Sequence, residues 1–310
     1  MHKTLQVARY LVFDIIAAII SWTLFYIYRK VYIEPIKFGY EIPVELNLKF
    51  YLALIFIPAF WITIYYITGQ YTNIYRKSRL LELGRTIMTS LAGVTIIFFL
   101  LLLNDWIPDY HKYYNLYFTL LGLHFGFTYL FRLIITTRTI HRIHKSIIGF
   151  NTLVIGANEK AVRLYDDLRS QKRPAGNKII GFLTVDEQDS YPLEAYVPNL
   201  GSYTNLQKVI NDNQVEEIII AIESSEHQLL SKILTLLENR THTVWGIPDL
   251  FDLLSNTAKT NTIFGSPLLK ISNGLMPAWQ ENVKRLIDVF GSVLAIILVS
   301  PVFIVLAVLI

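Results

Sequence analysis

Four long apolar runs dominate the first half of the chain. They cover residues 10–28, 50–68, 86–103 and 116–136, and charged or turn-forming residues flank each run. A helix needs about 20 mostly apolar residues to cross the hydrocarbon core of a bilayer, and each run comes close to that length. The pattern therefore predicts a domain of four transmembrane helices over residues 1–146.

From Asn151 onward, short strand-like runs alternate with amphipathic stretches. The predicted strands are 151–155, 178–185, 215–222 and 242–246, and the predicted helices lie near 158–171, 203–212 and 225–239. Such alternation is typical of a parallel sheet with crossover helices. It predicts a doubly wound, Rossmann-like α/β domain over residues 147–246.

The remaining residues have a different character. Residues 247–282 are interrupted by glycine and proline, which predicts a linker. Residues 283–310 form an apolar run with charges at its start and a Ser-Pro break midway: Lys284, Arg285, Asp288, Ser300 and Pro301. Proline removes a backbone hydrogen bond and clashes with the preceding turn, so we expect a bent, re-entrant membrane helix, the alternative being a fifth span.

Positive charges indicate the orientation of the spans, because Lys and Arg accumulate in cytoplasmic loops. The 69–85 loop and the segment after the fourth span are basic, whereas the 104–115 loop carries two aspartates against one lysine. The N-terminus and the α/β domain are therefore expected in the cytoplasm. The 29–49 loop has mixed charge and does not decide the matter.

Composition excludes several classes of protein. The chain has 310 residues, of which 53% are hydrophobic, a net charge of +4 and no cysteine. Disulfides, thiolate nucleophiles and cysteine metal sites are thus excluded, and no metal site is predicted. The cations stand beside hydrophobic segments, as Lys77 does, so we expect them to contact membrane lipid and not nucleic acid.

A glycine-containing turn after the first predicted strand is the main candidate for a ligand site. Gly156, Ala157 and Asn158 begin a sequence close to the dinucleotide fingerprint, and Asp186 follows the second strand where a ribose-binding acid could lie. The second fingerprint glycine, which admits a pyrophosphate, is Asn158 here. We therefore expect a structural turn, no NAD or other nucleotide, and a domain that serves oligomerisation or regulation.

Two ionisable residues lie inside predicted spans. Asp14 is about one turn from the expected cytoplasmic edge and could reach the interface or pair with Arg9, while a neutral His124 could form a hydrogen bond across the bundle. We expect both to serve helix packing. The adjacent carboxylates at 166–167 and 216–217 are predicted to lie on solvated faces, because neighbouring side chains diverge.

The order of these parts resembles the large bacterial polyprenyl-phosphate phosphoglycosyltransferases, which initiate exopolysaccharide and O-antigen assembly. The resemblance rests on the four spans, the turn at 154–157, the stretch 244–254, and the basic start and Ser-Pro break of the last segment. It implies transfer of a sugar 1-phosphate from a UDP-sugar to undecaprenyl phosphate at the bacterial inner membrane. We also expect the protein to be a homo-oligomer.

In that family an Asp-Glu pair with Mg²⁺ carries out catalysis after the re-entrant helix, and no such pair is expected before Ile310. The resemblance thus implies that residues 1–310 anchor and regulate, and are inactive alone. Two alternatives stay open: a membrane-anchored nucleotide-sugar dehydratase or epimerase, and a non-enzymatic membrane sensor or assembly module. The apolar segment after Lys284 argues against the first, which would continue into a second dinucleotide domain.

Overall fold

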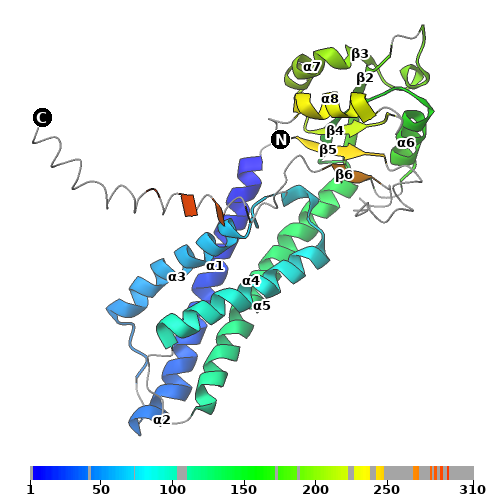
Figure 1. Cartoon of the computed structure of the whole chain (residues 1–310). Coiled ribbons are helices and arrows are strands. Elements are labelled where there is room, and N and C mark those ends of the chain that lie inside the picture. The colour runs from blue at the N-terminus through cyan, green and yellow to red at the C-terminus, as the bar shows by residue number, and fades with distance from the viewer. Residues whose placement is uncertain are drawn as a thin grey trace, which may run out of the picture. The chain divides into compact units, whose positions relative to one another are not determined.

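The computed structural model describes residues 3–40, 43–72, 74–102, 110–171, 174–186, 189–222, 227–237, 242–247 and 268–271, and the single positions 280, 283, 284, 287, 288 and 292. The chain divides into two compact units (Figure 1). One comprises 1–139 together with 276–310, and the other comprises 140–275. We refer to them as the membrane unit and the α/β unit.

Four long helices build the described part of the membrane unit: α1 (Lys3–Tyr28), α3 (Leu48–Ile67), α4 (Arg79–Ile97) and α5 (His111–His144). The first continues through a π-turn, η1 (Arg29–Ile33), into α2 (Glu34–Phe38), and α4 continues into η3 (Phe98–Leu102). A short 3-10 turn, η2 (Ile74–Arg76), lies between α3 and α4. The four predicted spans are confirmed as helices long and apolar enough to cross a membrane.

Aromatic side chains fill the interior of the bundle. Trp61 and Tyr65 of α3 are almost completely buried and belong to one cluster with Phe25 of α1 and Leu120 of α5. The helices approach closely where a glycine faces this cluster, because a Cβ on Gly93 of α4 would lie 2.4 Å from the Trp61 ring. Such close van der Waals packing is what holds helices together when lipid surrounds them.

A six-stranded sheet forms the centre of the α/β unit, in the order β3-β2-β1-β4-β5-β6. The strands are β1 (Phe150–Ile155), β2 (Asn177–Thr184), β3 (Asn199–Ser202), β4 (Glu217–Ile220), β5 (Thr243–Gly246) and β6 (Leu269–Ile271). The first five pair in parallel and β6 is antiparallel to β5. The predicted doubly wound sheet is confirmed, while β3 and β6, at the two edges of the sheet, were missed.

Helices cover both faces of this sheet (Figure 1). On one face α7 (Leu206–Asp212) and α8 (His227–Leu237) pack against β1 and β4, and on the other face α6 (Glu159–Ser170) packs against the alternate residues of the same strands. Both faces of β1 are buried over its second half, which explains the apolar run from Leu153 to Ile155. Short 3-10 turns, η4 (Pro192–Ala195) and η5 (Tyr203–Asn205), flank β3.

The two adjacent carboxylate pairs differ in environment. Asp166 and Asp167 on α6 are exposed, as predicted. The prediction is wrong for Glu217, which is 3% exposed at the start of β4 and accepts a hydrogen bond of 2.8 Å from Asn177 at the start of β2, on the other side of β1. Its burial follows from the central position of β4, which strand order alone determines.

The C-terminal part is described at a few positions. Strand β6 lies within 247–282, the range predicted as a linker. Lys284 and Asp288 have helical backbone and exposed side chains. Arg285, Ser300 and Pro301 lie outside the described residues, as does the bend of the expected re-entrant helix.

Candidate functional site

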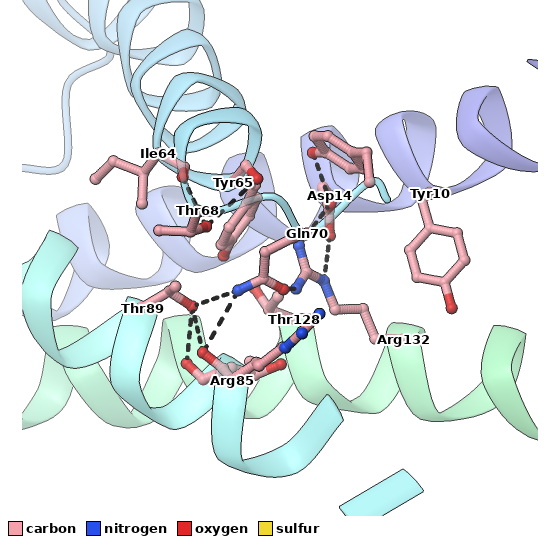
Figure 2. A network of polar contacts seen from close by, with 12 residues as sticks. Tyr10, Asp14, Ile64, Tyr65, Thr68, Gln70, Arg85, Thr89, Thr128 and Arg132 are labelled. Carbon is pink, nitrogen blue, oxygen red and sulfur yellow. Dashed lines mark hydrogen bonds and ion pairs between the residues drawn. The ribbon is translucent and has the colours of Figure 1, made fainter. Parts of the chain in front are cut away.

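A buried arginine organises the polar interior of the membrane unit. Arg132 of α5 has no exposed side-chain surface, and its Nε and Nη2 atoms donate to the two carboxylate oxygens of Asp14 on α1, each at 2.9 Å. Its Nη1 atom donates to the side-chain oxygen of Gln70 and lies 3.5 Å from Oε1 of Glu82 on α4. Figure 2 shows the guanidinium between Asp14 and Gln70. All three guanidinium nitrogens are therefore engaged.

A second ion pair adjoins the first. The Nζ atom of Lys77, in the loop before α4, lies 3.0 Å from Oε2 of Glu82, and the Lys77 side chain is 3% exposed. It also lies 4.7 Å from the centre of the Tyr10 ring. Burial lowers the pKa of Lys77 to about 8, although the Glu82 carboxylate opposes this shift. Two carboxylates thus face two cations, and the network is balanced in charge.

Aromatic groups extend the network inward along α3 and α5. The Arg132 guanidinium lies 4.0 Å from the centre of the Tyr65 ring, within the range of a cation–π contact. The Tyr65 hydroxyl lies 2.8 Å from Nε2 of His124, whose ring stacks on Trp61 with centroids 3.5 Å apart. The contacts connect the ion pairs to the aromatic core.

Tyr71 closes the network on the loop side. Its hydroxyl donates to Oδ2 of Asp14 at 2.9 Å. Burial raises the pKa of Tyr71, as does the adjacent Asp14 carboxylate, so the phenol keeps its proton and remains a donor. The Asp14 carboxylate thus accepts three hydrogen bonds, two from the Arg132 guanidinium and one from the Tyr71 hydroxyl.

Asp14 serves helix packing as expected, because it joins α1 to α5 through Arg132, but it neither reaches the interface nor pairs with Arg9, which contacts Gln6. Lys77 was expected at the membrane surface and is buried, because the 68–78 loop inserts its side chains into the bundle. The expected cross-bundle hydrogen bond of His124 is confirmed. Arg132 was missed, although an arginine inside an apolar run that faces an aspartate in another run is a readable signal.

The four predicted ligand-site residues come together in the α/β unit. Gly156, Ala157, Asn158 and Asp186 line a pocket of about 400 Å³ at the carboxyl end of β1. This is next to β4, where the strand order reverses and where ligands of doubly wound domains bind. Tertiary structure thus assembles the site, whatever its ligand.

The turn itself is built around Gly156. Its φ of +104° lies in the region that favours glycine, and a Cβ there would stand 2.4 Å from the carbonyl oxygen of Ala221. Asn158 is the N-cap of α6, where its side-chain oxygen accepts a hydrogen bond of 3.1 Å from the Ala161 amide. The residue that replaces the fingerprint glycine therefore has a structural task.

The electrostatics of the pocket come from two carboxylates. Glu159 and Asp186 are both exposed, and none of the ten described lining residues is basic. Tyr191 bounds the pocket and donates from its hydroxyl to the Asp186 carbonyl oxygen at 2.5 Å. Val185, Pro192 and Ile222 supply apolar surface.

Four apolar helices followed by a doubly wound α/β domain define a membrane protein with a Rossmann-like domain. The chain belongs to the family described as the CoA-binding domain, which matches residues 66–248, more than half of the chain. The match includes α4, α5 and the loop that carries Gln70 and Lys77, so it extends well beyond the α/β unit.

One curated relative is the UDP-glucose:undecaprenyl-phosphate glucose-1-phosphate transferase of Klebsiella pneumoniae. The two proteins are 25% identical over 163 residues, which are 52% of this chain and 34% of that enzyme. The chain thus aligns with about a third of the relative's length. The resemblance to initiating sugar transferases that the sequence predicted is confirmed.

The pocket does not fit the CoA that the family description suggests. A CoA pyrophosphate needs backbone access at the helix N-terminus or a cation nearby. Here the Asn158 side chain caps that terminus, Glu159 adds a negative charge, and the described lining holds no Lys or Arg.

Proposed function

We propose that this chain is the membrane-anchoring and regulatory part of a phosphoglycosyltransferase. The reaction is transfer of a sugar 1-phosphate from a nucleotide diphosphate sugar to undecaprenyl phosphate, which initiates exopolysaccharide, capsule or O-antigen synthesis. The order of parts carries the proposal, since four apolar helices precede a doubly wound domain in a chain similar to the Klebsiella enzyme. Undecaprenyl phosphate, a UDP-sugar and Mg²⁺ are the proposed substrates and cofactor of the complete enzyme.

The architecture suits a reaction between a lipid and a soluble substrate. The polyprenyl chain stays in the bilayer while the nucleotide sugar stays in water, so catalysis must occur at the membrane surface. A rigid bundle, held by the network around Arg132, would keep the attached catalytic part at that surface. The α/β unit would supply regulation or the contacts of a homo-oligomer. Mass photometry in nanodiscs measures the oligomeric state, and a monomer would count against the role in oligomerisation.

Enzymatic assay tests the proposed function. The protein expressed from its own gene is purified into nanodiscs and supplied with UDP-glucose, undecaprenyl phosphate and Mg²⁺, and UMP release is measured against residues 1–310 alone. We expect UMP from the gene product and none from residues 1–310. UDP-galactose and UDP-N-acetylglucosamine extend the test to other sugars. A gene product that folds but releases no UMP from any of these sugars would favour the non-enzymatic alternative.

The proposed topology places the N-terminus, the α/β unit and the end of the 283–310 segment in the cytoplasm of a bacterial inner membrane. Because the chain has no cysteine, single substitutions give unambiguous labels. In intact cells a membrane-impermeant thiol reagent should label Glu45→Cys and spare Ser190→Cys, both exposed positions. A cysteine placed after Ile310 should also be spared. Labelling of that cysteine from outside would exclude a re-entrant segment.

A further inference from the structure

We propose that the pocket at the carboxyl end of β1 binds an uncharged nucleoside and discriminates against the phosphorylated forms of the same compound. The proposal concerns the α/β unit alone and does not depend on the transferase reaction. The family description suggests CoA, but the described lining of the pocket has no basic residue for a pyrophosphate.

Access for a pyrophosphate is restricted on one side of the pocket. In dinucleotide sites the second fingerprint position is glycine so that phosphate can approach the backbone at the helix N-terminus. Here that position is Asn158, whose side chain already accepts the Ala161 amide hydrogen at 3.1 Å. Glu159, in the first turn of α6, brings its carboxylate to the positive end of the helix, where a phosphate would otherwise bind.

Charge acts in the same direction. Repulsion between two like unit charges 4 Å apart weakens binding by about fivefold in water and by roughly several hundredfold near a protein surface. A diphosphate beside Glu159 and Asp186 would meet repulsion of this size with no basic residue among the described lining residues to offset it. An uncharged ligand meets none of this repulsion.

The same residues offer good partners to a nucleoside. Asp186 follows the end of β2, where an acidic side chain can accept hydrogen bonds from both ribose hydroxyls. Val185, Pro192 and Ile222 form an apolar wall against which a flat base can lie. The volume of about 400 Å³ is near the lower end of the range for small-molecule sites, about 300 to 1,000 Å³, which favours a compact ligand.

Calorimetric titration of residues 1–310 in nanodiscs tests the proposal with two series: adenosine, AMP, ADP and CoA, and uridine, UMP and UDP. We expect one of the two nucleosides to bind and its diphosphate to bind at least about tenfold more weakly, as the repulsion above implies. In the adenosine series we expect CoA to bind no better than ADP.

Three isosteric variants of exposed carboxylates identify the site. Asp186→Asn should weaken nucleoside binding at least about tenfold, because the neutral amide has one acceptor oxygen in place of two and loses the charge that strengthens hydrogen bonds from hydroxyls. Glu159→Gln should raise diphosphate affinity relative to nucleoside affinity about fivefold or more, since it removes one repulsive charge. Asp189→Asn is the matched control, because Asp189 is exposed and is not among the lining residues of the pocket.

Several results would overturn the proposal. The proposal fails if adenosine and uridine both fail to bind. It also fails if CoA or a diphosphate binds as tightly as the corresponding nucleoside, or if Asp186→Asn has the same effect on binding as Asp189→Asn. Thermal unfolding of all three variants at the wild-type temperature would show that the differences are local to the ligand.

Discussion

Removal of one charge from the Asp14–Arg132 pair should be much more damaging than removal of both. Asp14→Asn keeps the shape of the side chain but leaves the buried Arg132 guanidinium with one carboxylate, at 3.5 Å, where it had two. Breaking a buried ion pair from one side costs about 3–5 kcal/mol. At about 2–4 °C per kcal/mol for a chain of this class, the unfolding temperature should fall by at least about 6 °C.

The Lys30–Glu34 pair is the matched control. Its ion-pair distance is 2.7 Å, shorter than any contact between Arg132 and Asp14, but the side chains retain 16% and 11% exposure. Partly solvated pairs contribute about 1 kcal/mol or less, so Glu34→Gln should lower the unfolding temperature by no more than about 4 °C. Thermal unfolding in detergent, followed by tryptophan fluorescence, measures both variants.

A double variant separates charge from packing. Asp14→Asn with Arg132→Met removes both charges and leaves the balanced Lys77–Glu82 pair, so it should be less destabilised than Asp14→Asn alone by at least about 1 kcal/mol. The reasoning fails if Asp14→Asn lowers the unfolding temperature no more than Glu34→Gln does. It also fails if the stability lost in the double variant equals the sum of the losses in Asp14→Asn and Arg132→Met measured separately.

Two further predictions concern α4 and the loop before it. Gly93→Ala should lower the free energy of unfolding by about 1–3 kcal/mol, because the added Cβ would overlap the packed Trp61 ring. In the control Gly84→Ala, on the same helix, the added Cβ meets nothing within 4 Å, so the free energy of unfolding should stay the same or rise by up to about 1 kcal/mol. Equal unfolding temperatures for the two variants would refute the close contact. The pKa of Lys77 is about 8 in the folded protein and 10.5 in the unfolded chain, so the folded state binds the proton more weakly. The free energy of unfolding of the wild type should therefore rise relative to that of Lys77→Met between about pH 8 and pH 10.5, by about 3 kcal/mol in all. A difference between the two proteins that does not change with pH would show that the pKa of Lys77 is unshifted.

Local patterns were sufficient for much of the architecture. The four apolar runs predicted the four long helices because each helix satisfies its own backbone hydrogen bonds, so length and hydrophobicity alone decide whether a segment can span a bilayer. The strands β1, β2, β4 and β5 were readable for a similar reason, since a strand buried on both faces is apolar throughout. Strand β3, with the sequence Asn-Leu-Gly-Ser, has a single large apolar residue, and β6 has three residues in a stretch that glycine and proline interrupt, so neither has a readable strand pattern.

The candidate ligand site was predictable in its members and not in its chemistry. The turn from Gly156 to Asn158 and the acid at Asp186 stand at the ends of neighbouring parallel strands, and that topology brings them to one edge. The cap formed by Asn158 and the lack of basic residues among the described lining residues depend on side-chain positions. Those positions decide which ligand class the pocket can accept.

The length, order and type of the main elements follow from hydrophobic period and helix and strand length, which are properties of a segment taken alone. The pairing of charged side chains depends on tertiary structure, because a charged side chain in an apolar helix has no ion-pair partner until other helices surround it. Asp14, Arg132 and the Lys77–Glu82 pair are far apart along the chain and come from three helices and a loop. Their burial, their charge balance and the depressed pKa of Lys77 arise only when the bundle closes and excludes water.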